Sequence, residues 1–127
     1  MNTPKKISTC FVSTLFEKYS NTESIVVVID VLRATSVISI AFHYGVKEII
    51  PVQSLEEARN YKGKENFIVA AEQNAMPVDG FDYGNSPFHY MNEKVQNKTL
   101  VLTSTNGTKT LEIAKNHKTI TASFVNF

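Results

Sequence analysis

The sequence predicts an α/β protein with a largely parallel or mixed sheet and flanking helices. Short apolar runs recur along the chain, stretches with helical spacing or capping signals separate them, and several runs are apolar on consecutive residues. Strands that are apolar on both sides are typical of a sheet covered by helices on both faces. A length of 127 residues fits a single domain, which we assign to residues 1–127.

Six short runs are predicted as strands. They are Ile7–Val12, Ile25–Ile29, Glu48–Val52, Asn66–Ala71, Thr99–Thr103 and Thr119–Phe124. After the second run, apolar residues recur at helical spacing from Val37 to Tyr44, and Gly45 suits the left-handed position just beyond a helix end. The pattern predicts a strand–helix–strand unit, and Leu55–Tyr61 and Thr108–Asn116 repeat the order.

Two helix starts carry the signature of a capping box. Thr14 is followed three residues later by Glu17, and Ser54 by Glu57. In this motif the hydroxyl and the carboxylate each accept a hydrogen bond from a free backbone N–H at the helix start. We therefore expect helices to begin at both places.

The connection from Gln73 to Asn97 has little periodicity and contains two glycines and two prolines. It is long for an inert connection in a compact domain, and long ordered loops are more often functional. We therefore expect this segment to contribute to a site.

The charge balance argues against a polyanionic partner. Thirteen Lys and Arg residues against 12 Asp and Glu residues give a net charge of +1, with no basic cluster, whereas nucleic acids and anionic membranes attract concentrated positive charge. The apolar runs are far shorter than the roughly 20 residues that cross a bilayer. The single cysteine, Cys10, excludes an internal disulfide and fits a reducing compartment. We predict a cytoplasmic protein that binds neither nucleic acid nor membrane.

The end of the second predicted strand carries a candidate anion site. Asp30 follows the strand directly, and Arg33, Thr35 and Ser36 gather where the next helix begins. Ligands of α/β sheets bind beyond the carboxyl ends of the strands. A guanidinium, hydroxyls and free N–H groups at a helix start suit phosphate or sulfonate.

Two further strand ends are polar. Glu72 ends the fourth strand, and Asp82 follows in the long loop, so Asp30, Glu72 and Asp82 are candidate ligands of Mg²⁺, which favours carboxylate oxygens together with water and phosphate oxygens. The fifth strand runs into a Gly-containing turn that can hold a second anion; its candidate residues are Thr105, Asn106, Gly107 and Thr108. Each feature alone is also typical of helix capping. Their coincidence at one end of the sheet favours a site.

Four motifs in order resemble the 2-phosphosulfolactate phosphatase family. They are Asp30–Ser36, Gly80–Pro87, Thr103–Thr108 and Ser123–Asn126, and the resemblance runs from Lys5 onward. It implies a Mg²⁺-dependent enzyme that hydrolyses the phosphate ester of phosphosulfolactate, a step of coenzyme M biosynthesis. By the resemblance, Asp30, Arg33 and Glu72 are catalytic, and the motifs add Asn85, Ser86 and Asn126 to the residues that bind the phosphorylated, sulfonated substrate.

The chain departs from the family pattern in two places. Family members usually carry Arg and then small glycines after the glutamate that matches Glu72, whereas this chain has Gln73-Asn74-Ala75. The family pattern also continues for about another domain's length beyond the last motif. The resemblance is therefore to an amino-terminal portion of the family, lacking its carboxyl-terminal part.

Several alternatives stay open at this point. One is a truncated anion-binding domain without turnover. Another is a receiver-like signalling domain. Such domains resemble one another in an acidic pair after the first strand and a lysine after the fifth, whereas this chain has Ser13-Thr14 and Ser104-Thr105 at those places. A nucleotide-binding module would need a Gly-rich phosphate motif, which the chain does not contain. The sequence also leaves open whether Asp30 or a water attacks phosphorus, which substrate is preferred, and whether the chain forms homo-oligomers.

Overall fold

The computed structural model describes residues 6–126 and has an α/β fold. The strands are β1 (Ile25–Ile29), β2 (Glu48–Pro51), β3 (Phe67–Gln73), β4 (Met76–Pro77), β5 (Thr99–Thr103) and β6 (Lys118–Ala122). The α-helices are α1 (Ala34–His43), α2 (Leu55–Arg59) and α3 (Gly107–Ile113). Three 3₁₀ turns are η1 (Ser13–Lys18), η2 (Pro87–Tyr90) and η3 (Glu93–Val95). Within the described range, no helix is long and apolar enough to span a membrane.

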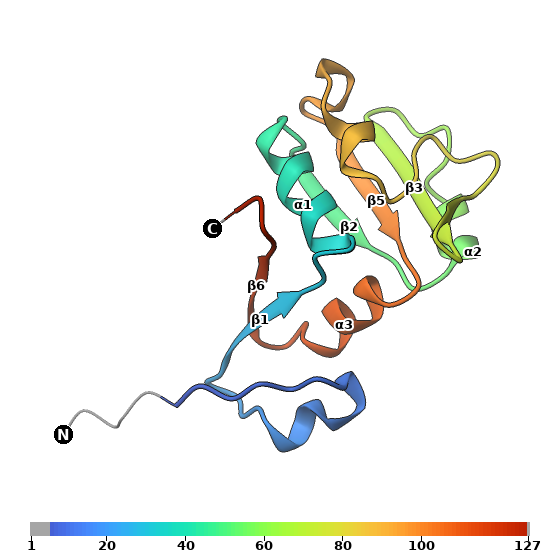
Figure 1. The fold of residues 1–127 in the computed structure, drawn as a ribbon. Helices are drawn as coiled ribbons and strands as arrows, with labels where there is room; N and C mark the ends of the chain where they lie inside the picture. The colour runs from blue at the N-terminus through green and yellow to red at the C-terminus, as the bar shows by residue number, and fades with distance from the viewer. Residues whose placement is uncertain (1–5, 127) are drawn as a thin grey trace.

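The strands form two sheets instead of one (Figure 1). A four-stranded sheet has the order β2-β5-β3-β4, in which the first three strands are parallel and β4 is antiparallel. β1 and β6 form a separate parallel pair. The predicted strand–helix–strand unit around α1 therefore joins two different sheets, because β1 pairs with β6 and β2 pairs with β5.

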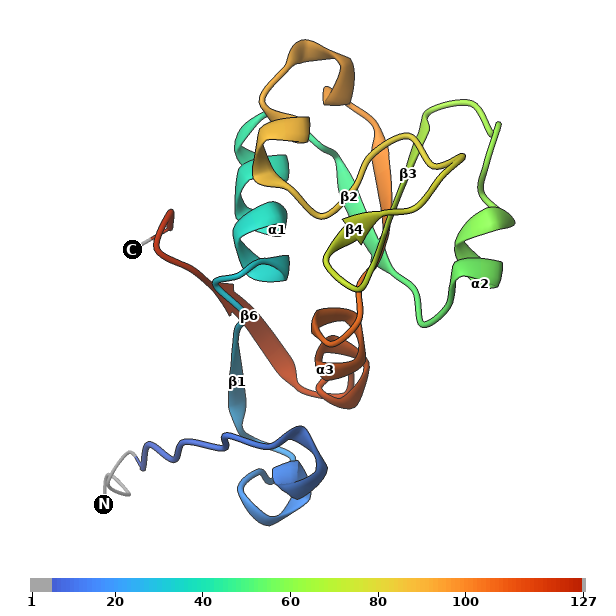
Figure 2. The same cartoon turned by 45° about the vertical axis from the view of Figure 1, so that its right-hand side comes forward.

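Helices and loops cover the four-stranded sheet on both faces, as the consecutive apolar residues predicted. α1 packs on one face with η2 and η3, and α2 packs on the other, as the turned view shows (Figure 2). Side chains alternate along each strand, so Leu100 and Leu102 face α1 while Val101 faces α2. All three are fully buried.

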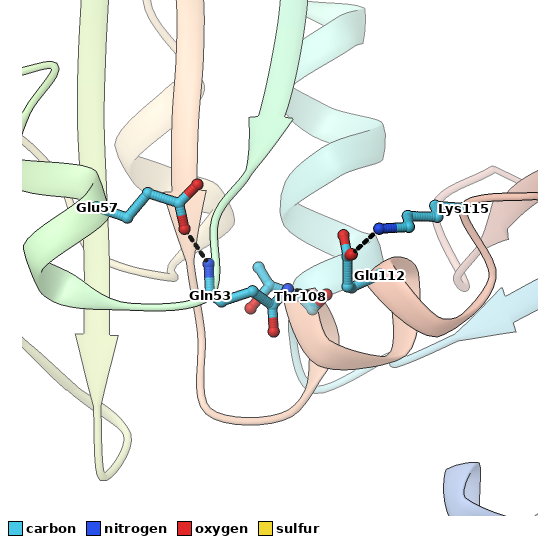
Figure 3. A network of polar contacts seen from close by, with 5 residues as sticks. All are labelled: Gln53, Glu57, Thr108, Glu112 and Lys115. Atoms are coloured by element: carbon cyan, nitrogen blue, oxygen red, sulfur yellow. Dashed lines mark hydrogen bonds and ion pairs between the residues drawn. The ribbon is translucent and has the colours of Figure 1, made fainter.

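The capping prediction for α2 is confirmed. Ser54 is the N-cap, and its hydroxyl accepts a hydrogen bond from the backbone N–H of Glu57 at 3.1 Å. The Glu57 carboxylate in turn accepts from the backbone N–H of Gln53 at 2.9 Å. The Gln53 side chain donates to the carbonyl of Thr108 in α3, so this residue joins the two helix starts; an ion pair between Lys115 and Glu112 lies farther along the chain (Figure 3).

The two predictions before residue 20 are wrong. Residues Ile7–Val12 do not form a strand, because they pair with no other strand of the described chain, and Ile7 and Phe11 are 94% exposed. Thr14 does not cap a helix either. The 3₁₀ turn η1 starts one residue earlier with Val12 at its cap position, and no side chain caps it.

The long connection after β3 starts with a tight hairpin that the sequence pattern did not predict. Gln73 pairs with Met76 across a two-residue turn, in which Asn74 and Ala75 have φ of 53° and 63°. Both turn residues of a type I′ hairpin need positive φ, which costs alanine about 1–2 kcal/mol relative to glycine. The hairpin brings the loop back over the end of β3 at Glu72.

Candidate functional site

A cavity of about 370 Å³ lies at the carboxyl ends of β1 and β3 and beside the turn that follows β5. Its lining comes from four segments of the chain, at residues 30–33, 72–75, 85 and 104–106. The lining residues are Asp30, Leu32, Arg33, Glu72, Asn74, Ala75, Asn85, Ser104, Thr105 and Asn106. The predicted strand ends therefore meet at one cavity, but they do not share one sheet edge, because β1 belongs to the smaller sheet.

Local hydrogen bonds fix the turn that presents Asp30. The backbone N–H of Asp30 donates to the Thr35 hydroxyl, and the backbone N–H of Thr35 donates to the Asp30 carbonyl, both at 3.0 Å. The Ser36 hydroxyl donates to the carbonyl of Val31 at 2.8 Å. Thr35 and Ser36 are buried and are not among the cavity-lining residues. They hold the strand-to-helix turn, and this places Asp30 at the cavity.

The Glu72 carboxylate is held by three donors. Its Oε1 accepts from the backbone N–H of Ala75 at 2.6 Å and from the Thr105 hydroxyl at 3.3 Å, and its Oε2 accepts from Asn85 Nδ2 at 3.4 Å. Asn85 is only 4% exposed, and its Oδ1 has no hydrogen-bond partner among the described residues. Glu72 therefore connects the hairpin, the long loop and the turn after β5.

Arg33 is the cation of this cavity. It occupies the N-cap position of α1, and its Nη2 donates to the Ala75 carbonyl at 3.3 Å. This bond ties the start of α1 to the β3–β4 hairpin. The guanidinium has five N–H donors, so further donors are left for an anion.

The turn after β5 contributes Thr105 and Asn106 to the cavity, while its next two residues are buried behind it. A Cβ added at Gly107 would lie 2.4 Å from Ala34 Cβ and 3.1 Å from Asp30 Oδ2. Thr108 exchanges hydrogen bonds with Ser104, including one from its own N–H to the Ser104 hydroxyl at 3.2 Å. Gly107 and Thr108 therefore shape the turn and let it approach α1.

Besides Thr35, Ser36, Gly107 and Thr108, three more predicted site residues lie outside the cavity lining, namely Asp82, Ser86 and Asn126. The Asp82 carboxylate accepts a hydrogen bond from the backbone N–H of Val69 at 2.8 Å, so it faces the middle of β3. Ser86 caps η2. The Asn126 side chain accepts from the backbone N–H of Ser123 at 2.7 Å and donates to the Thr121 carbonyl, which closes the turn after β6.

A family model for 2-phosphosulpholactate phosphatase matches residues 10–127. The match spans nearly the whole chain and includes every segment that lines the cavity. The chain belongs to the 2-phosphosulpholactate phosphatase family. Three curated relatives, each named "Probable 2-phosphosulfolactate phosphatase", extend this result.

The relative from Thermotoga petrophila is 50% identical over 100 residues, which make up 79% of this chain and 44% of that protein. The one from Caldanaerobacter subterraneus is 49% identical over 94 residues, covering 71% of this chain and 39% of the relative. The Clostridium novyi relative is 45% identical over 97 residues, which cover 75% of this chain and 41% of the relative. The chain thus spans less than half the length of these relatives.

In this member of the family, a second cavity of about 220 Å³ adjoins the first and shares Glu72, Asn74, Ser104 and Thr105 with it. Lys109 lines the second cavity. The polar lining residues Ser104, Asn74 and Lys109 were not predicted from the sequence. Ser104 lies within the motif Thr103–Thr108, and that motif could have identified it. Asn74 reaches the cavity only because the β3–β4 hairpin forms, and Lys109 only because of where α3 lies, so no sequence pattern indicated either residue.

The donor set suits a divalent cation only at Asp30 and Glu72, which line the same cavity. Among residues 6–126, no group of three or more His, Cys, Asp and Glu side chains gathers into a metal site made of protein ligands alone. Mg²⁺ is usually held by one or two carboxylates, with water and phosphate oxygens completing its coordination. Two carboxylates in one cavity therefore fit a Mg²⁺ that is shared with a phosphorylated ligand.

Proposed function

We propose that this chain carries the phosphate-binding site of a 2-phosphosulfolactate phosphatase. The observation behind the proposal is the convergence of Asp30, Arg33 and Glu72 on one cavity from separate segments. The proposed reaction adds water to phosphorus and breaks the ester P–O bond. The products are sulfolactate, which keeps the ester oxygen, and inorganic phosphate.

Arg33 is proposed to bind the phosphoryl group. Its guanidinium lines the cavity and is oriented by the Ala75 carbonyl, and a planar, permanently charged donor suits phosphate oxygens. Asn106, in the turn after β5, would donate a further hydrogen bond to the same group, whereas the Thr105 hydroxyl already donates to Glu72. Arg33 and Asn106 would orient the ester toward the carboxylates.

Asp30 and Glu72 are proposed to hold Mg²⁺. With Arg33 as the cation of the cavity and two carboxylates beside it, the charge of the lining alone disfavours a phosphate dianion, so a divalent cation would be needed to make the cavity attractive to it. When bound, Mg²⁺ supplies Lewis-acid polarisation of a phosphoryl oxygen. The three donors to Glu72 would keep its carboxylate in place during the reaction.

The second cavity is proposed to receive the other anionic groups of the substrate. Phosphosulfolactate also carries a sulfonate and a carboxylate, and the two cavities meet at Glu72, Ser104 and Thr105. Lys109 lines the second cavity and forms no ion pair with any described residue. A free ammonium group beside the phosphate site would select for a substrate with a second anion.

The test is phosphate release from phosphosulfolactate, with Mg²⁺ and with a chelator, on chain whose folding circular dichroism has confirmed. Metal-dependent turnover is expected, and Asp30→Asn should lower kcat by at least about 100-fold without a change in folding. Lys115→Ala is the matched control, because Lys115 pairs with Glu112 outside both cavities. Turnover that is unchanged in Asp30→Asn would refute the assignment.

A second candidate function is anion binding without turnover. It is favoured by the Glu72 carboxylate, both oxygens of which already accept hydrogen bonds from Ala75, Asn85 and Thr105. Calorimetry with phosphosulfolactate separates the two functions: binding with no phosphate release supports the second, and neither binding nor release refutes both.

A further inference from the structure

The parallel pair β1–β6 presents an apolar face to solvent. In β1 the side chains alternate, and Ile25, Val27 and Ile29 are 57%, 50% and 68% exposed. The register places Ile120 beside Val27 and Ala122 beside Ile29 on the same face. We call these five residues the β1–β6 face.

The opposite face of the pair is covered. Val28 is buried, Val26 and Thr121 are half-buried, and α1 packs against β6. β1 is apolar on both sides, which is typical of a strand in a sheet that lies between two layers. The β1–β6 face consists of four aliphatic β-branched residues and one alanine, and the exposed Lys118, which pairs with Ile25 on the same side, borders it at one end.

The edges of the pair are also open within the described chain. β1 pairs with β6 and with no other described strand, and the same holds for β6. Both views place this pair away from the four-stranded sheet (Figures 1 and 2). An isolated pair of strands is only marginally stable in water, and α1 supports this pair on one face alone. A further layer or strand is expected at this place.

We propose that the β1–β6 face binds the polypeptide that corresponds to the part of the relatives outside the match. The matched segment is 44% of the Thermotoga petrophila relative, so more than half of that protein has no counterpart in the matched region. A polypeptide of that length can supply a complete apolar layer, whereas a second copy of this chain would supply only the matched part again. This occupant is independent of the proposed activity.

The β1–β6 face lies next to the cavity, so a polypeptide bound there would affect the cavity. β1 ends at Ile29, and the next residue, Asp30, lines the cavity. Leu32, which also lines the cavity, is 88% exposed. A polypeptide on the β1–β6 face stands beside the cavity rim and orders the strand that presents Asp30.

Co-expression tests the proposal. This chain, carrying an affinity tag, is produced together with the segment of the Thermotoga petrophila relative that lies outside the match. The complex is then sized by chromatography with light scattering. A 1:1 complex is expected. The matched part of the same relative, co-expressed with the same segment, is the positive control, and failure of this chain to form the complex overturns the proposal.

Single variants locate the surface. Val27→Asp and Ile29→Asp should each weaken the complex at least about tenfold, because each places a charge in a desolvated apolar contact. Phe88→Asp is the control, since Phe88 is 79% exposed in η2, outside the pair, and should leave the complex unchanged. Circular dichroism checks that each variant folds, and slowed amide hydrogen exchange in β1 of the wild-type complex gives an independent readout. A complex that tolerates both aspartates, or self-association of this chain that both abolish, overturns the proposal.

Discussion

Gly107 at the start of α3 lies directly against Ala34 at the start of α1. A Cβ at Gly107 would stand 2.4 Å from the Cβ of Ala34, closer than real side chains approach one another. The same Cβ would stand 3.1 Å from Asp30 Oδ2. The turn after β5 can therefore lie this close to the Asp30 carboxylate, just beyond β1, only because residue 107 has no side chain.

Gly107→Ala should lower the free energy of unfolding by about 1–3 kcal/mol, because the added methyl group forces backbone to move. Urea denaturation measures the loss. The double variant Gly107→Ala/Ala34→Gly should recover part of it, since the second change removes the clashing carbon. A Gly107→Ala protein as stable as the wild type would contradict this packing.

Single substitutions of the three acidic residues predicted as metal ligands should have different effects on metal affinity. Asp30→Asn and Glu72→Gln should weaken binding of Mg²⁺ or of Mn²⁺, its paramagnetic substitute, at least about tenfold, because each removes a charged oxygen ligand from the cavity. Asp82→Asn should leave the affinity unchanged, since Asp82 accepts from the backbone of Val69 outside the cavity. Calorimetry and electron paramagnetic resonance measure the affinities. Equal losses in all three variants would argue for a site that includes Asp82.

Ala75→Gly should stabilise the chain by up to about 1 kcal/mol, because alanine has a φ of 63° here and glycine adopts that conformation without steric cost. Thermal unfolding measures the gain. Ala71→Gly, in the buried part of β3 where φ is not positive, is the control and should destabilise the chain. A loss of stability in Ala75→Gly would show that the hairpin does not strain this residue.

Tyr90 should make stability fall at high pH. Burial, and to a lesser extent the neighbouring Tyr83, raise the pKa of its hydroxyl, which donates to the Gly84 carbonyl at 2.8 Å. Above the ordinary tyrosine pKa of about 10, the unfolded chain loses this proton while the folded chain keeps it, so the free energy of unfolding falls by about 1.4 kcal/mol per pH unit. Below that pH the hydroxyl is neutral in both states.

The comparison with Tyr90→Phe isolates this effect. The variant loses one hydrogen bond and should be about 1 kcal/mol less stable near neutral pH. Its stability should nevertheless decline less steeply than that of the wild type above about pH 10. Urea titrations across this range measure both curves, and parallel curves would rule out Tyr90 as the titrating group.

Lys109→Ala should weaken the binding of sulfolactate, a product of the proposed reaction with two anionic groups, more than that of inorganic phosphate. The reason is that Lys109 lines the second cavity, whereas Arg33 lines the first. Lys115→Ala should change neither affinity, because Lys115 lines neither cavity. Calorimetry with each ligand measures the difference. Equal loss for both ligands would argue against a separate subsite.

The sequence by itself determined the elements that depend on local or periodic signals. The predicted strands at β1, β2, β3, β5 and β6 and the helix starting at Ser54 follow from apolar runs and from a hydroxyl three residues before a carboxylate. The same signals failed for Ile7–Val12, where an apolar run has no neighbouring strand. A strand is stabilised by its partner, and the partner is not encoded locally.

Only the tertiary structure decided how these elements form the site. Capping hydroxyls and ligand-binding hydroxyls have the same local sequence pattern, so the pattern could not show that Thr35 and Ser36 bond to the backbone while Thr105 lines the cavity. The convergence of Glu72 with Asp30 depends on a hairpin at two positive-φ residues and on the close approach of Gly107 to α1. Sequence spacing gave the residue types, but the distance between residues 30, 72 and 105 is set by packing across the whole chain.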